Sequence, residues 1–86
     1  MTEKFKWLAR KDYENFVHEN GREPMYAECS IAFQGAEPEQ ATFALFPYDV
    51  DVKNDDDIFF YCNGLEELLN LSEDFEVIRV LWFFNE

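Results

Sequence analysis

The sequence predicts a small α+β fold: a mainly antiparallel sheet of four to five strands, with two helices on one face. Residues 25–34 alternate between apolar and other residues over ten positions, which is typical of a half-buried strand. Residues 65–71 instead repeat leucine at helical spacing. Sixteen aromatic residues (ten Phe, four Tyr and two Trp) supply the dense core that a chain of 86 residues needs. We therefore expect a single domain spanning residues 1–86.

The N-terminal segment allows two interpretations. Apolar and basic residues alternate over residues 4–10 with Leu8 as the exception, which favours a short strand, and Asp12 would then cap a helix over residues 13–20. A single helix over residues 2–20 is the alternative, but it places Asp12 inside the apolar stripe and Trp7 opposite it. We predict the strand followed by the helix.

The remaining elements follow from periodicity and turn residues. In order, the sequence predicts a strand at 25–34, a turn at 35–40, a strand at 41–46, an acidic loop at 49–57, a strand at 58–62, a helix capped by Asn63 and running to about residue 71, and a strand at 76–84. The complete order is therefore strand, helix, three strands, helix and strand.

Charge is distributed unevenly along the chain. Residues 23–86 hold fifteen carboxylates and only two cations, Lys53 and Arg79, a formal charge of −13, whereas the first 22 residues sum to +1 and bring the total to −12. Such a surface repels nucleic acid and anionic membranes and attracts basic proteins. We expect no direct contact with nucleic acid or membrane, and a basic protein surface as the partner.

The densest group of acids is Asp49, Asp51, Asp55, Asp56 and Asp57. Carboxylates two residues apart on an extended segment lie roughly 6.6–6.8 Å apart, a spacing comparable to that of phosphates along one DNA strand. These five residues are the predicted acidic contact, and they suggest a protein that mimics nucleic acid and inhibits a nucleic-acid-binding protein. The alternative is that the acids are spread evenly and keep an aromatic-rich protein soluble.

The acidic loop does not match a calcium-binding loop. Counted from Asp49, the sixth position is Asn54 where an EF-hand has Gly, and the twelfth is Phe60 where it has a bidentate Glu. We expect no metal site and no cofactor.

Nucleophilic catalysis would require Cys29 or Cys62 beside His18, the one imidazole. Both cysteines fall inside apolar predicted strands, where a thiol behaves as a small hydrophobe, and the surrounding acids would raise its pKa. The sequence therefore predicts a protein that is not an enzyme. The first residues are charged and form no export signal, so we expect a cytoplasmic protein with reduced thiols.

By strict alternation, Phe46, Leu81 and Phe83 lie on the sheet face away from the helices. Either the N-terminal segment or a curled sheet covers these residues, or they form an interface with a partner or a second copy of the chain. The leading hypothesis is an acidic protein-binding domain that docks on a basic surface. The alternative is an interaction or homo-oligomeric module, a homodimer for example, that uses this apolar face while its acidity serves solubility.

Overall fold

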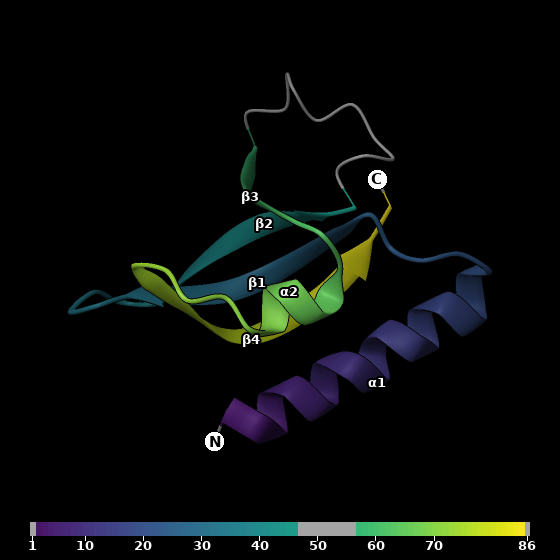
Figure 1. Ribbon diagram of the computed structural model, residues 1–86, viewed down its shortest axis with the longest axis horizontal. Helices are drawn as coiled ribbons and strands as arrows, with labels where there is room; N and C mark the ends of the chain where they lie inside the picture. Colours follow the sequence, from purple (N-terminus) through teal and green to yellow (C-terminus); the bar gives the residue numbers. More distant parts are fainter. Residues whose placement is uncertain (1, 47–56, 86) are drawn as a thin grey trace.

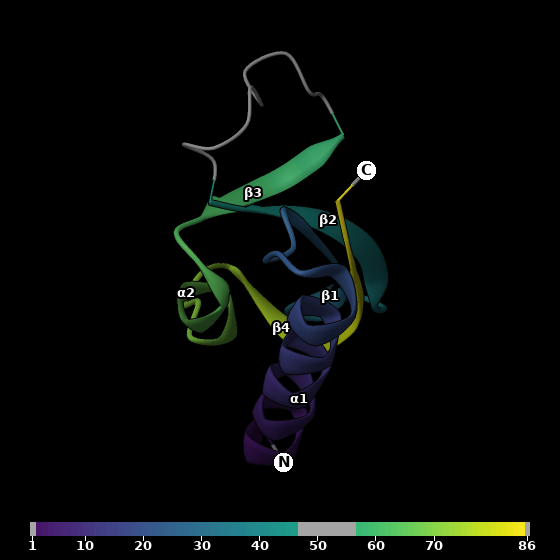
Figure 2. The same ribbon diagram turned by 90° about the vertical axis from the view of Figure 1, so that its right-hand side faces the viewer.

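The computed structural model describes residues 2–46 and 57–85. In chain order its elements are α1 (Thr2–Asn20), β1 (Tyr26–Phe33), β2 (Glu39–Leu45), β3 (Ile58–Cys62), α2 (Leu65–Leu69) and β4 (Phe75–Phe84). The four strands form one sheet in the order β3-β2-β1-β4 (Figure 1). Both helices pack on the same face of this sheet and share its hydrophobic core (Figure 2). The predicted α+β fold with two helices on one face is confirmed.

The N-terminal segment is one continuous helix, so the predicted strand at residues 4–10 is wrong. The residues of α1 that pack on the core are Phe5, Ala9, Tyr13 and Phe16. Their spacing of four, four and three matches the helical repeat. The two objections to a helix have a simple answer in the structure. Trp7 is 59% exposed and points to solvent, and Asp12 lies at the edge of the stripe in a groove that also holds Lys4 and Arg79.

The helix ends where the sequence predicts. Gly21 donates its backbone N–H to the carbonyl oxygen of Val17 over 2.8 Å, and it has a φ of 74°, a conformation that glycine adopts readily. The side-chain amide of Asn20 donates to the carbonyl oxygen of Phe16 over 2.9 Å. The bond from Gly21 satisfies one of the four last carbonyl groups, which have no partner within the helix.

Strand β1 lies inside the sheet and pairs antiparallel with both β2 and β4. Strand β3 departs from the antiparallel expectation, because it pairs parallel with β2. Twelve residues separate Leu45 from Ile58, and a connection of about a dozen residues is long enough to return the chain for a parallel pairing. The alternation within β3 carries no information about its direction, so the sequence could not distinguish the two arrangements.

Strand β4 contains two register shifts of the β-bulge type. Its pairing with β1 skips Ile78 and Leu81, so neither residue has a partner across the ladder. Each skipped residue moves the side chains beyond it to the other face of the sheet. The residues of β4 that pack on the core are therefore Phe75, Val77, Val80 and Phe83, spaced by two, three and three.

The core is centred on Phe43 of β2, whose side chain is fully buried. Its ring centroid lies 5.8, 6.4 and 6.1 Å from those of Phe59, Phe60 and Phe75. From α2, Leu65, Leu68 and Leu69 complete the core, as the leucine spacing predicts. The predicted Asn63 cap is wrong: the N-cap is Gly64, with a φ of 116°, a value that strongly favours glycine.

Candidate functional site

Carboxylates gather at the end of the sheet where the β1–β2 turn meets the start of β4. Ala32 pairs with Glu76 and Phe33 with Phe75, so the turn and the segment before β4 are neighbours in space. The acids at this end are Glu37, Glu39, Glu73, Asp74 and Glu76. All five are exposed, and none of their side chains makes a hydrogen bond or an ion pair with any residue that the structure describes. We call these five residues the acidic end.

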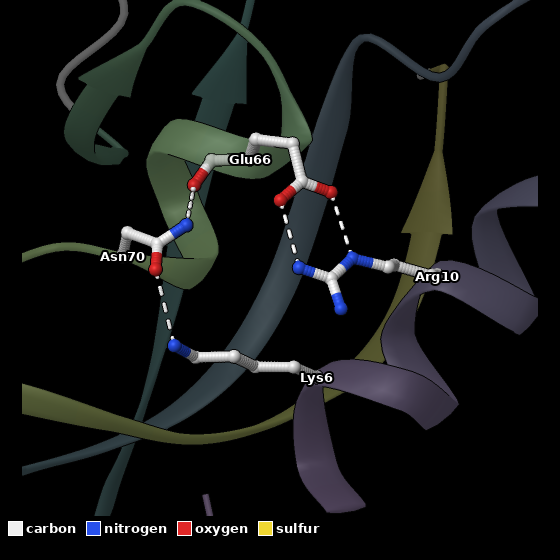
Figure 3. Close-up of polar contacts among 4 residues, drawn as sticks. All are labelled: Lys6, Arg10, Glu66 and Asn70. Carbon is white, nitrogen blue, oxygen red and sulfur yellow. Dashed lines mark hydrogen bonds and ion pairs between the residues drawn. The ribbon is translucent and has the colours of Figure 1, made fainter. Parts of the chain in front are cut away.

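The cations lie mostly in another layer of the molecule. Four of them are on α1, and two of these reach across to α2 (Figure 3). Arg10 donates from Nε and from one terminal nitrogen to the two carboxylate oxygens of Glu66, at 2.8 Å each, and Lys6 Nζ donates to Asn70 Oδ1 over 3.1 Å. The hydrogen bonds and charge of Arg10 lower the pKa of the Glu66 carboxyl group. The Arg10–Glu66 ion pair is formed within the protein and between the two helices, so it does not neutralise the carboxylates of the acidic end.

The predicted acidic contact lies mostly outside the described residues. Four of its five residues fall within residues 47–56, which are not described: Asp49, Asp51, Asp55 and Asp56. The fifth, Asp57, is exposed immediately before β3. The structure therefore tests neither their grouping nor their role. The acidic end, which it does describe, consists of residues that the sequence places on two separate turns and a strand.

The structure places one of the three residues of the predicted apolar face, Phe83, in the core. Phe83 is only 8% exposed and meets Tyr13 of α1 edge to face at 5.6 Å, so it belongs to the core. Leu81 is half-buried at a bulge. Phe46 is half-buried and packs against the core, where a Cβ added to Gly64 would lie 3.4 Å from its ring. Strict alternation misplaces Phe83 because the bulge at Leu81 reverses the face.

The face opposite the helices nevertheless carries aromatic side chains, although different ones. One row across the strands consists of Tyr61, Ala44, Tyr26 and Phe84, and the next consists of Ile58, Thr42, Glu28 and Trp82. Trp82 is 51% exposed and Tyr61 is 44% exposed. The N-terminal segment does not cover this face, because α1 packs on the other one. We call it the open sheet face.

Glu28 lies within the open sheet face. It is half-buried, and its two carboxylate oxygens accept hydrogen bonds from the Thr42 hydroxyl at 2.5 Å and from the Gln40 amide at 3.0 Å. Both donors are neutral. The sequence did not reveal the pairing of Glu28 with Trp82, because strict alternation assigns Trp82 to the helix-covered face. The available sign of a bulge was the spacing of the two polar residues of the strand, Glu76 and Arg79, which are three residues apart.

The groups that could serve a nucleophilic reaction are arranged unfavourably for one. Cys29 and Cys62 are free and buried, and burial raises the pKa of both thiols, that of Cys62 to about 12. His18 is exposed on α1. Within residues 2–46 and 57–85, no three His, Cys, Asp or Glu side chains are placed to hold a metal ion. No helix in this part of the chain combines the length and apolarity needed to cross a bilayer.

In comparisons with known proteins, no family model, no curated protein and no solved structure matches this chain. The interpretation of the site therefore depends on its geometry and charge.

Added salt is expected to stabilise the fold, because ions screen the repulsion among the unpaired carboxylates. Melting curves at about 20 mM and about 200 mM NaCl test this, with an expected rise of roughly 4–8 °C for each kcal/mol of repulsion removed. As a control, a variant with Glu37, Glu39, Glu73 and Glu76→Gln and Asp74→Asn should show a smaller rise. A melting temperature that falls with salt would contradict the prediction and indicate that attractive pairs dominate.

Proposed function

We propose that this protein is a non-enzymatic, acidic binding domain that docks on the basic surface of another protein. The observation that carries the proposal is the separation of charge in space. The acidic end has five carboxylates without a side-chain partner among the described residues, while the cations of α1 lie in the helical layer and Arg10 is paired with Glu66. Exposed carboxylates without an ion-pair partner can bind a basic surface at a small cost in free energy, because docking breaks no existing ion pair.

We further propose that the basic surface is one that normally holds nucleic acid in the cytoplasm. Lys and Arg side chains that neutralise phosphates release condensed counterions when they bind, and an array of carboxylates can occupy the same side chains. The domain would then compete with nucleic acid for its partner. Such docking is steered by charge, so its strength should fall steeply with salt.

Affinity capture tests the proposal. The protein is immobilised, exposed to nuclease-treated cell extract at about 50 mM salt and eluted with a salt gradient. The expected product is a basic nucleic-acid-binding protein that elutes with salt, that binds the purified domain directly, and that is displaced by its own nucleic acid. The acidic-end variant described above should lose at least about tenfold in affinity, since each rim charge contributes a fraction of a kcal/mol.

Two further variants locate the contact. Asp55, Asp56 and Asp57→Asn tests the predicted loop, and Glu14 and Glu19→Gln on α1 removes charge from the helical layer as a control. Retention of the captured protein by both the acidic-end and the loop variants would overturn the proposal. Loss of binding in the loop variant alone would move the contact to that loop.

A further inference from the structure

Glu28 has an environment that differs from those of the other described acids. It lies on β1, which has a neighbouring strand on each side, and it is half-buried between Thr42 of β2 and Trp82 of β4, which are its partners across the two ladders. The Thr42 hydroxyl and the Gln40 amide fix its carboxylate from the β2 side. A carboxylate held in this way has little rotamer freedom left to lose when it binds.

No described cation neutralises Glu28. Arg79 lies one row further along β4, opposite Ser30, and lines the groove beside Lys4 and Asp12 of α1; it forms no ion pair with Glu28 or with any other residue that the structure describes. Neutral donors orient the carboxylate and leave its charge in place. The site therefore has a fixed, half-buried negative charge that favours a cationic ligand.

Trp82 supplies the second half of the site. Residues directly opposite each other on antiparallel strands have Cβ atoms about 4.5–5.5 Å apart, so the half-exposed side chain of Trp82 leaves the open sheet face next to the side chain of Glu28. The face of a tryptophan ring attracts a cation electrostatically, most strongly among the aromatic residues. A carboxylate beside an indole face matches a planar guanidinium, which donates to the first while it stacks on the second.

We propose that Glu28 and Trp82 form a docking site for an arginine side chain of the basic partner. The inference depends on the proposed function and names its anchor on the open sheet face. Lysine fits less well, because an ammonium ion is a compact, strongly hydrated charge that cannot stack. A second copy of the chain is the less favourable occupant, because it would bring a formal −12 against −12.

The test uses a tryptophan signal and two defined peptides. Trp7→Phe leaves Trp82 as the one tryptophan in the chain. Titration with hexa-arginine amide is expected to change the Trp82 emission in a saturable way, and hexalysine amide is expected to bind at least about threefold more weakly. In the same background, Glu28→Gln should weaken hexa-arginine binding by at least about fivefold, whereas Glu67→Gln, which removes one exposed charge from α2, should weaken it by less than about twofold.

A second variant separates binding from folding. Trp82→Leu, followed by calorimetric titration, should abolish the preference for arginine over lysine, and its half-exposed position makes it a mild substitution. Melting curves on Glu28→Gln test whether Glu28 has only a structural role. A lower melting temperature with an unchanged preference for arginine over lysine would overturn the inference.

The remaining outcomes distinguish this inference from the proposed function. Equal weakening by Glu28→Gln and Glu67→Gln, with loss of binding in the acidic-end variant, would overturn the arginine site and leave charge-driven docking in place. No hexa-arginine binding at about 50 mM salt would overturn the arginine site, while the capture experiment tests docking separately. A dimer by sedimentation that already shields Trp82 from acrylamide would show that a second copy covers the face, and would overturn the arginine site.

Discussion

Phe43→Ala is expected to lower the free energy of unfolding by about 3–5 kcal/mol. The side chain is fully buried and meets three other phenylalanine rings, so truncation leaves a cavity that the sheet cannot close. A chain of 86 residues has a total stability on the order of 4–13 kcal/mol, so this single change removes a large part of it. Urea unfolding followed by circular dichroism measures the loss.

Phe59→Ala is the matched control. Phe59 touches Phe33, Phe43 and Phe75, but its side chain is 44% exposed, so its removal should cost less than half as much. Equal losses for the two variants would contradict a core centred on Phe43.

The two thiols are expected to resist modification in the folded protein. Burial raises the pKa of Cys62 to about 12 and that of Cys29 still further above its ordinary value. At pH 8 the thiolate fraction of Cys62 is then about a thousandfold below that of an exposed cysteine. A chromogenic disulfide reagent should therefore label neither thiol quickly in buffer and both of them in denaturant. Rapid labelling of one equivalent in the native protein would contradict the structure.

The same pKa shifts predict a loss of stability in alkali. Above the ordinary cysteine pKa, near 8.5, the unfolded chain ionises its thiols while the folded chain keeps them protonated. The unfolded state then holds fewer protons, so the free energy of unfolding falls as the pH rises toward 12. Labelling of the buried thiols requires unfolding, so the destabilising substitution Phe43→Ala should also increase the rate of thiol labelling at constant pH.

The sequence predicted the elements whose periodicity has one interpretation. The alternation of residues 25–34 and the leucine spacing after Gly64 placed β1 and α2 correctly, and Asn20-Gly21 placed the end of α1. Residues 5–9 were ambiguous, because apolar residues at 5 and 9 fit both a two-residue and a four-residue repeat. Contact with β4 decides for the helix, and this contact is not visible in the local pattern.

Strand β4 explains why the candidate site could be only partly predicted. Eight of its ten residues are apolar and show little alternation, so the spacing of Glu76 and Arg79 was the one sign of the bulges at Ile78 and Leu81. Trp82 was therefore placed on the wrong face and Phe83 among the interface residues. Glu28 was correctly placed on the open face, but its significance depends on Trp82, Thr42 and Gln40, which come from two other strands.

The contact between α1 and β4 has a consequence for synthesis of the protein. These are the first and the last elements along the chain, and the apolar stripe of α1 packs beside Phe83. A ribosome adds about 5–20 residues per second, so the helix leaves the exit tunnel seconds before its partner strand exists. Until then Phe5 and Tyr13 have no sheet to cover them. We therefore expect folding only after β4 has left the exit tunnel, and premature termination within β4 should produce a protease substrate instead of a folded fragment.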